Sequence, residues 1–321
     1  MDNSHPASPQ DDVDPQIRLF LERMAEGHAG YPDLSSIPLP DARRITEAVR
    51  AQWVHGGPDM ASSTELRVGS LGTRVRILRA QNEASLPALV YLHGGGWTLL
   101  SIDTHDRLMR EYAARAGVAV IAVDYSRSPE AKYPRALEET VSVIDWLERC
   151  GAEHGIDPSR LAVGGDSAGA NLSIASQLRL RALGRPVLSA MLLNYGVYTD
   201  QPTPSWSRYD GPAYMLETKE MRWFWNNYLR SDADRDDPFV MPLLGELRGL
   251  PPTYMVIAEC DVLADGNRAM AAALHNAGVE TDARVYKGAT HSFLEAISIS
   301  EMANQALADA SNWLKHRLHT K

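Results

Sequence analysis

Short, uninterrupted apolar runs that alternate with amphipathic stretches constrain the fold of this chain more than any other feature. The apolar runs are 88–92, 118–123, 161–163, 190–193 and 254–258, and the amphipathic stretches are 107–116, 135–149, 170–183 and 267–277. A strand that is apolar on both sides belongs in a sheet that helices cover on both faces. The alternation therefore predicts an α/β fold with a mostly parallel, doubly wound sheet.

The segments that flank this alternation complete the predicted sheet. Residues 65–68 and 73–78 alternate polar and apolar side chains around a Ser-Leu-Gly turn, which predicts an antiparallel hairpin. A further strand is expected at 283–286 and a final amphipathic helix at 301–318. The sheet should therefore have about eight strands.

Two regions carry helical patterns but no strand pattern. Asp14, followed by proline, begins a helix that Gly27 ends, and a second amphipathic helix starts at Asp41. Later in the chain, the clearest element is a helix over 218–230. The boundaries we predict are 1–55 and 200–245 for a helical cap, and 56–199 and 246–321 for the main domain.

Composition and charge exclude several classes of protein. The chain has 32 Lys and Arg against 41 Asp and Glu, and its formal charge of −9 disfavours nucleic-acid binding. The apolar runs are far shorter than the roughly 20 residues of a membrane span. The polar residues 1–14 show no signal-peptide pattern, so we expect no membrane partner. Cys150 and Cys260 are too few for a disulfide scaffold, which favours a reducing, cytoplasmic location.

Residues 165–169 read Gly-Asp-Ser-Ala-Gly and lie where an apolar strand meets a helix. Glycines at both ends permit a tight strand–turn–helix connection that exposes the serine. By chance, about one chain in ten of this size would contain G-x-S-x-G somewhere. A position between a strand and a helix is several-fold rarer, so Ser167 is the candidate nucleophile.

A glycine run, His-Gly-Gly-Gly-Trp at 93–97, follows the apolar strand 88–92. Successive glycines let backbone N–H groups face a cavity, where they can stabilise an oxyanion. A phosphate-binding loop would need the pattern G-x-x-x-x-G-K-[ST], which is absent. A purely structural glycine turn is the other alternative, and the pairing with the serine motif favours an oxyanion hole.

A serine nucleophile needs a histidine base and a carboxylate that orients the histidine. His291 follows the last strand-like run, where a sheet of this type builds its site. Asp261 follows the preceding strand and is the preferred carboxylate. Asp265 is the rival, although it also suits the N-cap of the next helix, and Glu259 is expected to be structural.

These motifs resemble those of the bacterial hormone-sensitive-lipase-like (family IV) esterases, within the α/β-hydrolase superfamily. The glycine run matches HGGGW and the serine motif matches GDSAG, while 124–134 resembles the family's D-Y-R-L-A-P-E stretch. The segment Asp-Val-Leu-Ala-Asp resembles D-P-L-x-D, whose first aspartate is the triad member, which supports Asp261. The likeness extends from about residue 40 to the C-terminus.

The resemblance implies an α/β-hydrolase fold with a helical cap and the activity of a serine carboxylesterase. Ser167 would attack the ester, His291 would carry the proton, and Asp261 would orient the imidazole. No metal and no organic cofactor would be needed. The expected oxyanion donors are the backbone N–H groups of Gly94, Gly95, Gly96 and Ala168.

The substrate pocket is expected beneath the cap, with room for short-to-medium acyl chains. Its candidate lining residues are Trp97, Asp166, Trp206, Tyr214, Leu216 and Val262. Trp223 and Phe224 lie at helical spacing, so we expect them to hold the cap together instead.

Two other functions stay open at this point. An amidase, a carbamate hydrolase or a specialised deacylase would use the same triad. A non-catalytic binding protein on the same scaffold would lose a triad residue, as do some plant hormone receptors that resemble the family, whereas all three are present here. The expected partner is a small-molecule ester, and a homodimer through edge strands or terminal helices is a further expectation.

Overall fold

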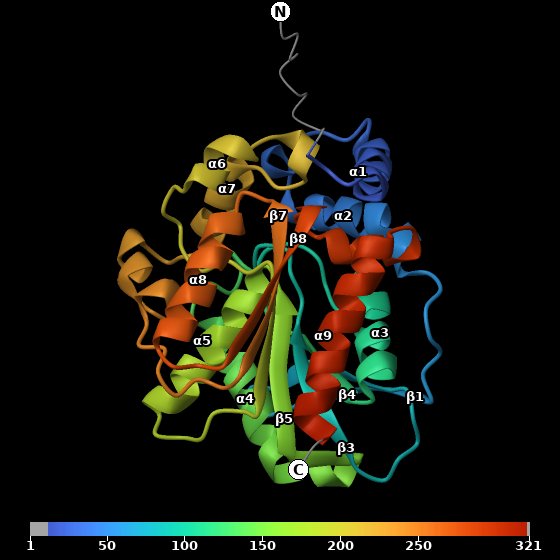
Figure 1. Ribbon diagram of the computed structural model, residues 1–321, viewed down its shortest axis with the longest axis vertical. Coiled ribbons are helices and arrows are strands. Elements are labelled where there is room, and N and C mark those ends of the chain that lie inside the picture. Colours follow the sequence, from blue (N-terminus) through green and yellow to red (C-terminus); the bar gives the residue numbers. More distant parts are fainter. Residues whose placement is uncertain (1–11, 320–321) are drawn as a thin grey trace, which may run out of the picture.

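An eight-stranded sheet forms the centre of the protein (Figure 1). The computed structural model describes residues 12–319. The strands are β1 (Ser62–Val68), β2 (Thr73–Arg79), β3 (Leu86–Leu92), β4 (Ala119–Asp124), β5 (Ile156–Asp166), β6 (Ala190–Asn194), β7 (Thr253–Cys260) and β8 (Thr281–Thr290). Their order is β1-β2-β4-β3-β5-β6-β7-β8, with β2 antiparallel to both neighbours and all other pairs parallel. The predicted hairpin and the mostly parallel sheet are confirmed.

Helices cover both faces of the sheet, as the apolar strands require. One face carries α4 (Arg135–Cys150), α5 (Ala168–Ala182) and α8 (Ala264–Asn276), and the other carries α3 (Asp106–Ala116) and α9 (Glu301–His319) (Figure 1). Alternate residues of β3 enter the two cores: Val90 and Leu92 pack on the first face, and Leu89 and Tyr91 on the second. The doubly wound architecture is therefore confirmed.

Two N-terminal helices precede the sheet, close to where the sequence predicts them. Asp14 caps α1 (Pro15–His28), because its Oδ1 accepts hydrogen bonds from the next N–H groups. Gly27 does not end this helix, which continues to His28. A Cβ on Gly27 would lie 2.9 Å from Val49 Cγ1, so the glycine lets α1 approach α2 (Leu39–Val54) closely.

The end of the chain holds α1 in place. The Asp14 N–H donates to the Gly288 carbonyl over 3.0 Å, and the Glu301 N–H donates to the Gln16 side chain over 2.8 Å. A Cβ on Gly288 would lie only 2.8 Å from Asp14 N, which explains the glycine at that position. The first helix is thus tied to β8 and α9, the last elements of the chain.

Residues 200–245, all of them described, form no strand, as predicted. They contain α6 (Pro204–Arg208), α7 (Thr218–Tyr228) and short 3₁₀ turns at 212–214, 232–236 and 242–244. A capping box between Glu217 and Glu220 begins α7, which ends at Tyr228 and not at residue 230. Figure 1 shows α1, α2, α6 and α7 gathered at one end of the sheet. The domain boundaries stay a prediction, and residues 1–11 of the first cap segment lie outside the described residues.

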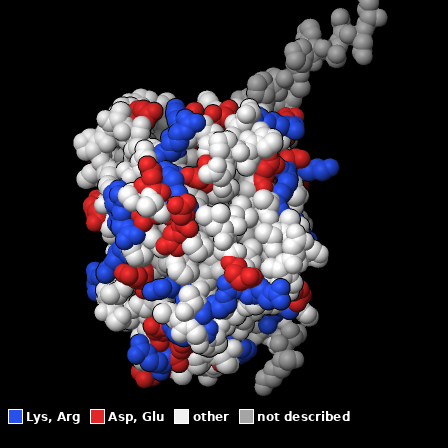
Figure 2. Space-filling model, turned by 90° about the vertical axis from the view of Figure 1, so that its left-hand side faces the viewer, with Lys and Arg blue, Asp and Glu red and all other residues white. Residues whose placement is uncertain are grey.

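The surface mixes both signs of charge. Figure 2 shows Lys and Arg interleaved with Asp and Glu over one face of the molecule. Among the helices of residues 12–319, none has the length and apolar character needed to cross a membrane. Cys150 and Cys260 are both free thiols.

Candidate active site

Ser167 occupies a strained turn between β5 and α5. Its backbone has φ 54° and ψ −117°, a combination that non-glycine residues rarely adopt and that is typical of a nucleophile elbow. A Cβ on Gly165 or on Gly169 would lie 2.2 Å or 1.8 Å from the Leu92 carbonyl oxygen. Both glycines are therefore needed for the turn to pack against the end of β3.

The structure brings the three predicted triad residues together. His291, which follows β8, places Nε2 3.0 Å from Ser167 Oγ and Nδ1 2.7 Å from Asp261 Oδ2. The other oxygen of Asp261 accepts the Leu263 N–H over 2.9 Å, which fixes the carboxylate. All three triad side chains are buried. A hydroxyl, an imidazole and a carboxylate in this order can activate the serine as a nucleophile.

Burial and charge act in opposite directions on the pKa of His291. Burial favours the neutral ring and lowers the pKa, while the Asp261 carboxylate favours the charged ring. The charge and hydrogen bond of Asp261, together with the more distant carboxylates of Asp166 and Glu295, outweigh burial. The pKa of His291 is therefore raised. The site therefore stabilises an imidazolium.

Asp265 lies outside this site and is not a helix N-cap, contrary to our expectation. Helix α8 begins at Ala264, and no side chain caps it. The Asp265 carboxylate instead accepts the Ser205 N–H and a hydrogen bond from Arg268, each over 2.8 Å. It thus connects α6 to α8.

The glycine run after β3 lies beside Ser167. Gly95 and Gly96 have φ values of 110° and 59°, which glycine adopts most readily, and both line the same cavity as Ser167 and His291. A Cβ on Gly96 would lie 2.1 Å from the Phe224 ring. Ala168 is the first residue of α5, so its N–H has no acceptor within the helix.

Gly94 must be removed from the predicted oxyanion donors. Its N–H already donates to Asp166 Oδ1 over 3.1 Å. The same carboxylate accepts the Tyr91 hydroxyl over 2.9 Å and lies 3.3 Å from His105 Nε2. Asp166 is therefore not a pocket residue, because it lies behind the loop and fixes its backbone.

The buried His105–Asp166 pair was not identified from the sequence. Burial alone would raise the pKa of Asp166. The charge and hydrogen bond of His105 and the hydrogen bond from the Tyr91 hydroxyl lower it by more, so the pKa is lowered overall. Burial lowers the pKa of His105, but the charge and hydrogen bond of Asp166, together with Glu295 and the Ser101 carbonyl, raise it by more. The available signal was the Thr-His-Asp segment at 104–106, which matches the family pattern but carries no obvious chemistry of its own.

A cavity of about 610 Å³ opens onto the triad. Its walls come from the glycine run, α1, α2, the loop between those helices, and α7. Its lining residues include Arg50, Gly95, Gly96, Ser167, Leu216, Trp223, Phe224 and His291. Helices α1, α2 and α7 therefore line the same cavity as Ser167 and His291.

Comparison with known proteins gives the family. Residues 89–295 match the family model described as the alpha/beta hydrolase fold. The chain belongs to the α/β-hydrolase family. The hydrolase is 34% identical over 319 residues to the acetyl esterase of Salmonella choleraesuis, covering 97% of this chain and 99% of that protein. The predicted resemblance to hormone-sensitive-lipase-like esterases is confirmed.

Solved structures similar to the hydrolase include named esterases. A thermostable esterase from Pseudomonas putida is similar with a TM-score of 0.90 and 31% identity. The match covers 98% of this chain and 100% of that one. A hyperthermophilic esterase from Pyrobaculum calidifontis has a TM-score of 0.87 and 30% identity, covering 94% of this chain and 98% of that one. The fold of the hydrolase is thus an esterase fold along nearly its whole length.

Of the predicted pocket residues, Leu216 lines the cavity, whereas the others lie elsewhere in the hydrolase. Trp97 is fully buried and stacks on Tyr228 with ring centroids 4.3 Å apart. Tyr214 packs against Tyr209, Trp206 lies against the core, and Val262 is fully buried. Their side chains turn into the cap and sheet cores, not toward Ser167.

Trp223 and Phe224 line the cavity, although the sequence suggested a core role for them. The reason is the docking of α7, which brings the Phe224 ring against Gly96. Periodicity shows which residues of a helix share a face, but not which neighbour that face meets.

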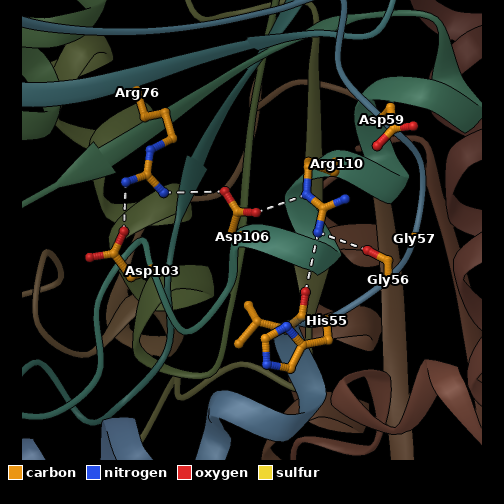
Figure 3. A pocket seen from close by; sticks show the side chains of 9 residues that line it. His55, Gly56, Gly57, Asp59, Arg76, Asp103, Asp106 and Arg110 are labelled. Carbon is orange, nitrogen blue, oxygen red and sulfur yellow. Dashed lines mark hydrogen bonds and ion pairs between the residues drawn. The ribbon is translucent and has the colours of Figure 1, made fainter.

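A second hollow of the hydrolase, also about 610 Å³, lies away from the triad, between the end of α2 and the start of α3 (Figure 3). Arg76 pairs with Asp103 and Asp106, and Arg110 pairs with Asp106 as well. Arg110 also donates to three backbone carbonyls, those of residues 54, 56 and 58. The Arg110 guanidinium thus holds the end of α2 against α3.

Two further observations bear on the chemistry of the hydrolase. Burial raises the pKa of the Cys260 thiol to about 12, so this cysteine is not a competing nucleophile. Within residues 12–319, no three His, Cys, Asp or Glu side chains are grouped so that they could hold a metal ion.

Proposed function

We propose that this carboxylic ester hydrolase cleaves esters of short-to-medium acyl chains through a covalent acyl-enzyme on Ser167. The observation that carries the proposal is the continuous hydrogen-bonded series from Ser167 Oγ through His291 to Asp261. The named esterases to which the chain is similar support the class of reaction. Residues 1–55 and 200–245 act as the cap over the catalytic residues 56–199 and 246–321.

The first half of the reaction forms the acyl-enzyme. Ser167 Oγ attacks the ester carbonyl carbon while its proton passes to His291 Nε2. Asp261 holds the Nδ1–H tautomer and stabilises the imidazolium. The tetrahedral intermediate collapses when the carbon–oxygen bond to the alcohol breaks, and His291 gives its proton to the leaving alkoxide. In the second half, water attacks the acyl carbonyl by the same route and releases the acid.

The developing oxyanion needs preorganised donors in a site shielded from water. The backbone N–H groups of Gly95, Gly96 and Ala168 fill this role in the proposal, since Gly94 is engaged by Asp166. Removing one such donor typically costs about 2.7–4 kcal/mol of transition-state stabilisation. The Asp166 hydrogen bond keeps the loop in the conformation that presents the other two glycines.

The proposed cap around the cavity and the names of the similar proteins favour a small acyl group. The volume of the cavity is about 610 Å³, Leu216 and Phe224 both line it, and the Phe224 ring lies against Gly96 of the glycine run. Some of the similar proteins are named acetyl esterases, which supports short chains. Small-molecule esters are the proposed partners, with neither nucleic acid nor membrane involved. The cytoplasmic location and the homodimer stay predictions.

A series of p-nitrophenyl esters from acetate to palmitate tests the proposal. We expect kcat/KM to be higher for acetate through hexanoate than for palmitate, because each methylene that fits adds about 1 kcal/mol until the pocket ends. Deleting residues 1–40 should lower stability and blur the cutoff. A profile that still rises at palmitate, or one unchanged by the deletion, would contradict the role of the cap. Matched amides, measured in parallel, separate an esterase from an amidase.

A further inference from the structure

Arg50 of α2 is a buried cation in the wall of the catalytic cavity. It is 8% exposed, and it lines the same cavity as Ser167 and His291. Arginine in a protein interior normally has each of its N–H groups paired, because an unpaired buried donor is costly. The partners of Arg50 therefore show whether its position is only structural.

Among the described residues, only one nitrogen of Arg50 has a hydrogen-bond partner. Nε donates to Glu295 Oε1 over 3.3 Å and lies 3.0 Å from Oε2. Nη1 and Nη2 form no hydrogen bond with any residue from 12 to 319. Arg43, two turns earlier on α2, differs: its three nitrogens donate to the Thr98 and Ser128 carbonyls and to Glu130. Arg50 thus keeps the outer fork of its guanidinium for something other than the fold.

The unpaired fork has the chemistry of a carboxylate receptor. Two parallel N–H groups match the two oxygens of a carboxylate, and such charge-assisted pairs are among the stronger hydrogen bonds in proteins. A dianionic phosphate fits less well, because Glu295 already offsets part of the charge of Arg50. Asp33, Glu217 and Glu220 also line the cavity, so a highly charged anion would be repelled.

The other basic side chains near Arg50 in the cavity wall, His28 and Lys219, are poorly suited to bind a carboxylate. Arg50 is therefore the group that would bind it. His28 lines the cavity, but burial lowers its pKa despite a hydrogen bond to the Met24 carbonyl, so the ring is neutral near pH 7. Lys219 lies 3.1 Å from Glu217, which neutralises it. Glu295 is among the groups that raise the pKa of His291, so the Arg50–Glu295 pair is in electrostatic reach of the triad.

We infer that Arg50 is a specificity residue and that the preferred esters of this enzyme carry a carboxylate, which binds the free Nη groups of Arg50. This inference rests on the proposed function, because it names the substrate class of the same site. It adds a second fixed point to the substrate, the first being the carbonyl in the oxyanion hole. Two such points orient the ester for attack by Ser167.

Matched pairs of esters that differ only in charge test the inference. One pair is 3-acetoxybenzoate and 3-acetoxybenzamide, with the charge on the alcohol side. The other is p-nitrophenyl hydrogen adipate and its monoamide, with the charge on the acyl side. For wild-type enzyme, we expect the ratio of kcat/KM, carboxylate over amide, to exceed one in at least one pair.

Arg50→Gln should lower that ratio about tenfold or more, the value expected for one hydrogen bond to a charged group. This variant leaves Glu295 buried without its partner, so the double variant Arg50→Gln/Glu295→Gln is measured with it to keep the pair neutral. Arg44→Gln is the matched control, because Arg44 is on the same helix but exposed and pairs only with Asp41. Its ratio should equal that of wild-type enzyme.

Three outcomes would overturn the inference. They are a ratio below one in both pairs of esters, a ratio that neither Arg50 variant changes, and an equal loss in the Arg44 control. If wild-type enzyme hydrolyses none of the four esters, nor p-nitrophenyl acetate, the proposed function fails instead. Hydrolysis of the uncharged esters with a ratio that is indifferent to Arg50 leaves the proposed function intact and removes only the carboxylate subsite.

Discussion

The two hollows of this protein have the same volume, about 610 Å³ each, but they differ in how their charged groups are satisfied. In the hollow between α2 and α3, Arg76 and Arg110 are held by carboxylates and carbonyl oxygens (Figure 3). In the catalytic cavity, Ser167 is strained, and two nitrogens of Arg50 have no hydrogen-bond partner within residues 12–319. Function is therefore better indicated by groups that the fold leaves incompletely satisfied than by the size of a hollow.

The largest expected contrast between the hollows comes from Ser167→Ala. Removing the nucleophile should lower kcat for p-nitrophenyl butyrate by about 10⁶-fold, as in other serine hydrolases. The fold should persist, which circular dichroism checks, because the change removes one oxygen at the end of a strand. Ser159→Ala, on the surface, is the control. Near-normal turnover by the folded Ser167 variant, or organophosphate labelling of another residue, would move the nucleophile elsewhere.

Asp261→Asn tests the next group in the catalytic cavity. An amide at this position favours the wrong imidazole tautomer, so kcat should fall about 10⁴-fold. Asp265→Asn should leave kcat close to the wild-type value and lower the free energy of unfolding by about 1 kcal/mol, because Asp265 only connects α6 to α8. Steady-state kinetics and urea denaturation separate the two effects. The opposite ranking would make Asp265 the catalytic carboxylate.

The pH dependence of kcat/KM should be set by the titration of His291 in the catalytic cavity. The imidazole must be neutral to accept the serine proton, so activity falls as pH drops through its pKa. Burial lowers that pKa, but Asp261 and the other nearby carboxylates raise it more, so the acid limb should lie above 6.5, the ordinary value. Returning each sample to neutral pH checks for unfolding. An acid limb below 6.5 would show that burial outweighs the carboxylates.

The smallest effect on activity is expected in the second hollow. Arg110→Gln removes hydrogen bonds to Asp106 and to carbonyls at the end of α2, and should lower the free energy of unfolding by about 2 kcal/mol. The kcat/KM for p-nitrophenyl butyrate should stay within twofold of wild type. A loss of activity without a loss of stability would give this hollow a function.

The grouping of Ser167, Asp261 and His291 could be predicted from sequence because its signals are local. Ser167, Asp261 and His291 each follow an apolar strand, and the carboxyl ends of parallel strands meet at one edge of the sheet. The same reasoning gave the order of strands and helices. These features depend on residues within one or two neighbouring elements.

The features missed from sequence depend on how distant elements dock. Gly94 was wrongly counted as an oxyanion donor, because its acceptor, Asp166, is 72 positions away in the chain. Phe224 was assigned to the cap core, but α7 turns it toward Gly96. Arg50 was not noticed at all, since its partner Glu295 lies 245 positions later. No local pattern reports contacts of this kind.

The contacts between the two ends of the chain also set an order for biogenesis. A ribosome makes α1 and α2 well before their partners Gly288, Glu295 and Glu301. Phe20 can pack on Trp53 of α2 during synthesis, but the two helices lack their contacts with β8 and α9 until those elements have left the exit tunnel. Chaperones have most to protect in that interval, because exposed apolar surface on a nascent chain promotes aggregation. A chain whose synthesis stopped before β8 would contain Ser167 but not His291. In the proposed mechanism, its serine would have no base and the chain could not hydrolyse esters.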